Sequence, residues 1–243
     1  MRIIARAMHK YIAVIFALLL SALTCSGQSF LAKYPKLTKK NLPEFFEDWK
    51  AYSDSISSNI TISSPLDSLI YERNLFTYAG IALQSPRPRY IVYPEAVEVL
   101  TYKELGDTTN NNTSFSLLMS IPYAMREYTK EMVSTKIPDG GLYMTNGISK
   151  KLDSFLYVGK YRKRKEREKR LKELREYISV SYGIFNTHTY CDYPLILYIG
   201  VASDIIVFHL ALDCNEATEI WYRKDNDRII ELHNNRGKSI IYD

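Results

Sequence analysis

The spacing of short hydrophobic segments near the carboxyl terminus constrains the fold of this chain more than any other feature. Over about the last 65 residues, runs rich in β-branched, aliphatic and aromatic residues alternate with short polar links. The runs cover residues 178–190, 195–201, 205–212, 217–223, 228–232 and 239–242. Strands spaced this closely pair with their neighbours in the chain, so the pattern predicts an antiparallel meander.

The chain before the meander has helical periodicity in four places. Leu42-Pro43-Glu44 carries the proline and the acidic residue of a helix start, and Ser64 has the position of an N-cap for a second helix. Thr145 or Asn146 is expected to cap a third helix, whose apolar residues recur at helical spacing. Residues 162–177 predict a fourth, strongly charged helix with few apolar positions.

Shorter segments between these helices predict a few additional strands. Residues 90–102 read as one or two strands broken near Pro94, and 142–144 as a short strand after the turn at 138–141. Residues 115–133 are ambiguous because Pro122 divides them, and their second part, 125–133, is compatible with a helix.

Helices that come first and strands that come last are typical of the α+β class. We therefore expect N-terminal helices packed on a C-terminal antiparallel β-sheet meander. The expected division is a signal peptide over 1–27, an extended lead-in over 28–40 and a single α+β domain over 41–243.

The first 27 residues have the three parts of a secretory signal peptide. A basic start precedes an apolar run of about 13 residues, which ends in small residues. The run is shorter than the ~20 residues of a spanning helix, so we expect no transmembrane segment once it is removed. The predicted location is the periplasm or the cell surface.

Two kinds of processing fit the end of this segment. Cleavage after Gly27 would use the small residues that precede it. Lipid attachment at Cys25 is the weaker alternative, because Ala22 and Thr24 differ from the residues usual before a lipoprotein cysteine.

The basic residues gather in one segment of the mature chain. Loss of Arg2, Arg6 and Lys10 with the signal peptide lowers the formal charge from +5 to +2. Between residues 160 and 170, eight residues are basic and two are acidic. This run is a candidate binding surface for anionic glycans, lipid head groups or an acidic partner, and a solvated helix face is the alternative. The candidate residues are Lys160, Arg162, Lys163, Arg164, Lys165 and Arg167. We expect no nucleic-acid partner.

Only Cys191 and Cys214 remain after signal removal, and an oxidising compartment would permit a disulfide between them. Both lie equally far from the turn expected near Ala202 and Ser203, so a regular hairpin would place them opposite each other. A bulge would separate them, and the alternative is a pair of free thiols.

The weak candidates for catalysis lie on and beside one predicted strand. Strand alternation over 205–212 places His209 on an apolar face, and Asp204 and Asp213 bracket the strand. A histidine and a carboxylate can do acid–base chemistry in a pocket, whereas a core histidine with solvated turn acids is the alternative. No common hydrolase, nucleotide-binding or zinc motif is present, so we expect neither a cofactor nor a metal.

Three stretches resemble a recurring pattern in uncharacterised exported proteins of gut Bacteroidota. They are residues 141–145 leading to 152–156, residues 170–178, and the strand-rich end with 222–224 and 228–232. The resemblance covers roughly the last 100 residues and implies export and this fold rather than an activity. Residues 181–185 depart from the tryptophan and glycine that the pattern has there. The layout is also similar to cystatin-like or NTF2-like folds, by analogy only.

This resemblance implies one further modification site. Proteins of these bacteria carry O-glycans at Asp-Ser/Thr motifs, and Asp107-Thr108-Thr109 fits that pattern in a polar loop. Thr108 is therefore a candidate glycosylation site.

The sequence favours a non-enzymatic binding or interaction protein for a glycan or a protein partner. The chain has 20 tyrosines, which suit strands and binding surfaces alike, and lacks a clear catalytic constellation. The alternative is a small NTF2-like pocket enzyme, a hydrolase or isomerase, that uses His209 with Asp204 or Asp213. An immunity-type partner that masks another protein is a third hypothesis.

Overall fold

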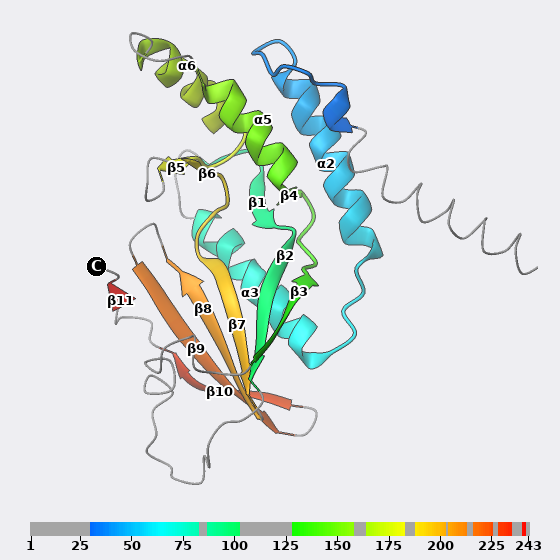
Figure 1. The fold of residues 1–243 in the computed structure, drawn as a ribbon, viewed down its shortest axis with the longest axis vertical. Helices are drawn as coiled ribbons and strands as arrows, with labels where there is room; N and C mark the ends of the chain where they lie inside the picture. Colours follow the sequence, from blue (N-terminus) through cyan, green and yellow to red (C-terminus); the bar gives the residue numbers. More distant parts are fainter. Residues whose placement is uncertain are drawn as a thin grey trace, which may run out of the picture.

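The computed structural model describes residues 30–82, 87–102, 128–157, 164–182, 188–202, 204–212, 216–225, 228–234 and 240–241. Helices dominate the first part and strands the last, which confirms the α+β class (Figure 1). The predicted signal peptide, with Cys25, and the predicted glycosylation site at Thr108 lie outside the described residues. Within these ranges, no helix has the length and apolarity needed to cross a membrane.

A mixed sheet of seven strands forms the larger half of the molecule. Its main path runs β10-β9-β8-β7-β2-β3, and β11 pairs with the start of β9. The antiparallel meander from β7 to β10 is as predicted, whereas β2 lies parallel to β7. The bounds are β2 Ala96–Tyr102, β3 Tyr128–Ser134, β7 Leu195–Ala202, β8 Ile205–Ala211, β9 Glu216–Asp225, β10 Arg228–Asn234 and β11 Ile240–Ile241.

The helix considered for residues 125–133 is wrong over the described part, which forms strand β3. All seven residues of β3 pair with β2, from Ala96 opposite Ser134 to Tyr102 opposite Tyr128. An ion pair between Lys130 and Glu98 joins the two strands, with 2.5 Å between Nζ and Oε2. Cross-strand pairing has overridden a local pattern that fits either structure.

The first run of the expected meander is mostly not strand. Of residues 178–190, only β5 (Ser181–Tyr182) and β6 (His188–Thr189) are strands within the described part, and they pair with each other. The hairpin from β7 to β8 has a register shift between Ile196 and Tyr198. Leu197 is the extra residue, and its side chain is exposed, as expected at a bulge.

Helix α3 (Pro65–Ala82) lies along one face of this sheet (Figure 1). Ser64 caps it as predicted, because its Oγ accepts a hydrogen bond from the amide of Asp67 at 3.0 Å. Arg73 of α3 forms an ion pair with Glu231 of β10, with 3.0 Å between Nη2 and Oε2. We call the buried residues between α3 and the strands the sheet core: Leu69, Ile70, Val97, Val99, Ile196, Ile199, Ile206, Phe208, Leu210, Ile220 and Tyr222.

A second, helical core lies around the short parallel pair of β1 (Ile91–Pro94) and β4 (Gly141–Met144). Helices α2 (Leu42–Asn59), α5 (Asn146–Leu156) and α6 (Arg164–Arg175) contribute to it. Thr145 is the N-cap of α5, with its Oγ1 accepting from the amide of Ile148 at 3.2 Å. The helical core comprises Phe30, Tyr34, Leu37, Leu42, Phe45, Phe46, Trp49, Tyr90, Val92, Leu142, Ile148, Leu152, Phe155, Leu156, Leu171, Leu174, Ile178, Val180 and Tyr190.

The extended lead-in expected over 28–40 is packed structure from Phe30 onward. Phe30, Tyr34 and Leu37 are buried in the helical core, although only residues 30–32 of this segment are helical. The Tyr34 hydroxyl donates to Asp48 Oδ2 at 2.8 Å, and Lys151 Nζ donates to the Tyr34 carbonyl oxygen at 2.6 Å. Lysines lie between these apolar residues, so the segment reads as polar in the sequence.

Candidate functional site

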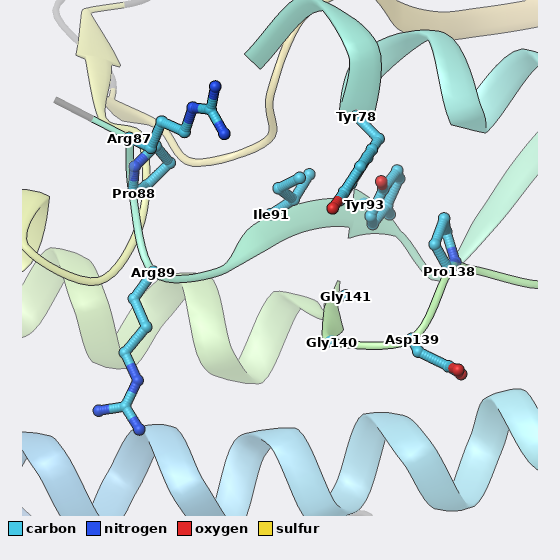
Figure 2. Close-up of a pocket in the computed structure, with 10 residues that line it drawn as sticks. All are labelled: Tyr78, Arg87, Pro88, Arg89, Ile91, Tyr93, Pro138, Asp139, Gly140 and Gly141. Carbon is cyan, nitrogen blue, oxygen red and sulfur yellow. The ribbon is translucent and has the colours of Figure 1, made fainter. Parts of the chain in front are cut away.

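A cavity of about 230 Å³ opens between α3, β1 and the turn before β4. Figure 2 shows Tyr78 descending from α3 beside Tyr93 of β1, with Ile91 on the same strand and the 138–141 turn below. The parallel pairing of β1 with β4 places this turn opposite the start of β1, with Ile91 next to Gly141. The site is thus assembled from segments far apart in the sequence.

Tyr93 is the most unusual residue of this cavity. Its side chain is 2% exposed, yet its hydroxyl has no hydrogen-bond partner among the described residues. Burial raises the pKa of Tyr93 well above its usual value, and the nearby charge of Asp192 adds to the shift. The hydroxyl therefore stays protonated, and its donor and its acceptor are both unused within the described residues. Tyr78 is 54% exposed and forms the open side.

The turn at the cavity floor is as predicted and is closely packed. Gly141 donates its amide hydrogen to the Pro138 carbonyl oxygen at 3.0 Å, and Gly140 has a φ of +83°. A Cβ at Gly141 would lie 2.9 Å from the Tyr93 ring. Glycine at this position lets the strand approach the ring, because any side chain would displace it.

Two arginines flank the cavity and have different surroundings. Arg89 extends toward α2, where its Nη2 lies 2.7 Å from Glu47 Oε1 (Figure 2). Arg87 leaves the chain on the other side, is exposed, and has no carboxylate partner among the described residues. Arg87 is thus the cation of this site that is available to an anionic group.

His209 lies in the sheet and not in this cavity. Its imidazole is 3% exposed and stacks on Tyr198, with 4.0 Å between ring centroids. Its Nδ1 lies 3.3 Å from Oε1 of Glu219, which also accepts a hydrogen bond from Trp221 Nε1 at 3.1 Å through Oε2. Burial lowers the pKa of His209 to about 4 and raises that of Glu219. The result is a buried neutral imidazole. A substrate could reach it only if the side chains packed against it moved.

The carboxylates expected to work with His209 are elsewhere or not described. Asp204 is exposed at the other end of β8, where its Oδ2 lies 3.6 Å from Nε of Arg223. Five strand positions separate it from His209, a span of roughly 16 Å. Asp213 lies outside the described residues. Sequence reasoning missed Glu219, which lies directly opposite His209 on the paired strands β8 and β9.

The basic run is described only in part. Lys160, Arg162 and Lys163 lie outside the described residues, and Arg164, Lys165 and Arg167 lie in the first turn of α6. Arg164 pairs with Glu168 at 2.8 Å, and Arg167 Nη2 lies 3.1 Å from His188 Nε2. Of the described candidates, Arg164 is paired with an acid, whereas Arg167 contacts a histidine and keeps its charge.

Cys191 is a free thiol in this structure, and Cys214 lies outside the described residues, so the disulfide stays a prediction. Cys191 packs against the helical core, and burial raises the pKa of its thiol to about 12. The bulge at Leu197 changes the register on which the predicted pairing depended.

Asp192 is a buried acid that sequence reasoning did not single out. It is 3% exposed, and its Oδ2 accepts a hydrogen bond from the Val92 amide at 3.0 Å. The Asp192 amide donates to the Val92 carbonyl oxygen at 3.2 Å, so the two residues are joined in both directions. Burial raises the pKa of Asp192 to about 6. This contact ties the segment before β7 to β1, behind the cavity.

Among the described residues, no group of three or more His, Cys, Asp or Glu side chains is placed to hold a metal ion. The described lining of the cavity offers two tyrosine hydroxyls, the guanidinium of Arg87, the carboxylate of Asp139 and turn backbone. We find no protein-family model that matches this chain, and no match among curated proteins or solved structures.

Proposed function

We propose that this protein is an exported, non-enzymatic binding protein that holds one sugar unit of a glycan in the cavity between Tyr78 and Tyr93. The observation that carries the proposal is the unpartnered Tyr93 hydroxyl. Buried tyrosine hydroxyls usually find a partner, because desolvation without a hydrogen bond costs about 1–3 kcal/mol. A ligand hydroxyl would supply the missing hydrogen bond.

The size and lining of the cavity support a sugar unit. A volume of about 230 Å³ is below the ~300–1,000 Å³ of sites for drug-sized ligands, which favours a single ring. Tyrosine rings and Ile91 offer apolar contact to one face of a sugar, while the two hydroxyls offer hydrogen bonds. The lining combines polar and apolar surface in similar amounts, which suits a ring that carries both hydroxyls and an apolar face.

The acid–base alternative has weaker support. It rests on His209, which would work with Glu219 rather than Asp204 because only Glu219 lies beside the imidazole. A general base needs access to a substrate proton, and this imidazole is packed against Tyr198 inside the sheet. The cavity on the other side of the molecule contains no histidine.

The test is binding of glucose, galactose, mannose and N-acetylglucosamine to the purified protein by calorimetry. We expect millimolar affinity for at least one sugar, reduced roughly 3- to 10-fold in Tyr93→Phe, because one hydrogen bond contributes about 0.5–1.5 kcal/mol. Tyr34→Phe is the matched control, since it removes a hydroxyl that already has a partner in Asp48 and lies outside the cavity.

Two results would contradict the proposal. One is the absence of binding by every sugar in the panel. The other is equal affinity in the wild type and in Tyr93→Phe, which would place the sugar elsewhere on the protein. Hydrolysis or isomerisation of any of these sugars that is lost in His209→Gln would instead favour the enzyme.

A further inference from the structure

Arg87 lines a second depression as well as the cavity. This depression, about 400 Å³, lies against α6 and is lined by Arg87, Glu168, Leu171, Lys172, Arg175 and Glu176. Because one side chain belongs to both, the two concavities are neighbours that share a wall. A ligand longer than one sugar unit can therefore extend from the cavity past Arg87 onto α6.

The charges of the depression favour an anionic ligand. Glu168 is already compensated by Arg164, which leaves Glu176 as the acid without a described ion pair. Arg175 donates to the Val180 carbonyl oxygen at 3.1 Å but keeps its charge, because its partner is neutral. Arg87 and Lys172 have no carboxylate partner among the described residues. Buried Leu171 gives this positively charged depression an apolar floor.

We propose that the ligand is an acidic oligosaccharide, with one sugar ring at Tyr78 and Tyr93 and an anionic group of the next unit at Arg87. The chain then continues over Leu171 between Lys172 and Arg175. This proposal rests on the proposed function and adds the ligand's charge and length. The anionic group is a carboxylate or a sulfate, since a guanidinium binds both through paired hydrogen bonds.

An oligosaccharide fits these observations better than an acidic peptide. Tyr93 lines the cavity, and a ring rich in hydroxyls can supply the hydrogen bond that its buried hydroxyl lacks among the described residues. The positive charge without an ion pair begins at Arg87, because Arg89 of the cavity is paired with Glu47. A ligand with a neutral polar end and a negative continuation matches this order.

The experiment compares trigalacturonic acid with its methyl ester, which has the same length and rings but no charge. We expect the acid to bind the wild type at least 10-fold more tightly than the ester at 50 mM salt, with the difference shrinking at 500 mM salt. A galactose disaccharide with a sulfate on one unit, compared with the same disaccharide without sulfate, tests the sulfate source in the same way. Preference for either anionic probe supports the proposal and identifies the group.

Three variants test which side chain binds the anionic group of the ligand. Arg87→Gln is expected to abolish the preference for the acid while leaving affinity for the ester within 2-fold. Lys172→Gln should reduce the affinity for the acid trimer about 2- to 5-fold, because Lys172 is a single exposed charge at the far end of the depression. Lys165→Gln is the matched control, an exposed lysine of the same helix that does not line the depression.

The outcomes separate this proposal from the proposed function. Equal binding of acid and ester, with loss of both in Tyr93→Phe, overturns the acidic ligand and leaves the sugar-binding site. A preference for the acid that survives Arg87→Gln overturns the placement of the charge. A hexaglutamate peptide that binds as tightly as the acid trimer, with the same loss in Arg87→Gln, overturns the glycan in favour of a protein partner. Absence of binding by every sugar overturns both proposals.

Discussion

The helical core and the sheet core differ in how they bury polar groups. In the helical core, Trp49 Nε1 donates to the Tyr143 carbonyl oxygen at 2.8 Å, and Ser53 Oγ accepts from the Tyr143 amide at 2.9 Å. On the strands of the sheet, His209 Nε2 and Thr218 Oγ1 are buried without partners. Within the described residues, every buried side-chain atom that lacks a partner belongs to the sheet, to α3 on it, or to Tyr93 at the cavity.

This difference follows from how each core is built. The helical core is made of stacked rings, with Phe46 parallel to Tyr177 at 4.4 Å and to Tyr90 at 5.8 Å. Its polar side chains reach backbone atoms that the short β1–β4 pair leaves available. In the wide sheet, the strand backbones bond to one another, so a buried polar side chain must find another side chain. The lack of partners for His209 Nε2 and Thr218 Oγ1 follows from this constraint.

The largest effect is expected for Trp49→Ala in the helical core. Loss of this buried ring costs about 3–5 kcal/mol, and the orphaned carbonyl of Tyr143 adds to that loss. Ile199→Ala in the sheet core removes a side chain that makes no hydrogen bond and should cost about 2–4 kcal/mol. Urea denaturation measures both losses in the free energy of unfolding. If Ile199→Ala loses as much as Trp49→Ala or more, the two cores do not differ in the way described.

His209 should make the sheet sensitive to acid. Its folded pKa of about 4 lies below the ordinary 6.5, so the unfolded chain takes up the proton first as pH falls. The stability is complete above pH 6.5 and is lost as pH falls toward 4, by up to about 3.5 kcal/mol. His209→Phe keeps a ring against Tyr198 and should remove this loss. Urea midpoints at pH 4, 5, 6 and 7 test it, and a variant as acid-sensitive as the wild type would refute it.

Asp192, beside the helical core, should act in the opposite direction. Its folded pKa of about 6 lies above the ordinary 3.8, so the folded protein holds the proton longer as pH rises. The stability it contributes is complete below pH 3.8 and is lost as pH rises to 6, by up to about 3 kcal/mol. Asp192→Asn should remove this loss and expose the acid sensitivity caused by His209. If Asp192→Asn follows the wild-type pH profile, the carboxyl is not the buried titrating group.

The smallest effect on stability is expected at the cavity. Tyr93→Phe removes an unpartnered hydroxyl and should change the free energy of unfolding by less than about 0.5 kcal/mol. Tyr143→Phe, on the neighbouring strand, removes a hydroxyl that donates to the Thr135 carbonyl oxygen and should cost about 1–2 kcal/mol. Thermal unfolding of the two variants compares them directly. A larger loss in Tyr93→Phe would mean that its hydroxyl is satisfied within the protein.

The local parts of this fold were predictable from the sequence. Ser64 and Thr145 cap helices as expected, because capping depends on residues only three positions away. The strand break at Pro94 and the 138–141 turn also follow from local chemistry. The α+β class follows from the order of these elements.

The candidate site was not predictable, because pairing between distant segments creates it. No local pattern indicates that β1 pairs with β4, which places Gly141 beside Tyr93. The same holds for β2, which the sequence marks as a strand but not as a neighbour of β7. Only the contact between His209 and Glu219 had a local signal, in the symmetry of their hairpin.

The position of β2 has a consequence for how the chain reaches this structure. Val99 pairs with Ile199, so the parallel contact in the middle of the sheet closes a loop of roughly a hundred residues. The β2–β3 pair and α3, which covers Val97 and Val99, can form early, but the free backbone edge of β2 gains its partner only after β7 has emerged from the ribosome. Until then this edge can pair with another chain. A chain shortened before residue 195 should therefore aggregate rather than fold in part.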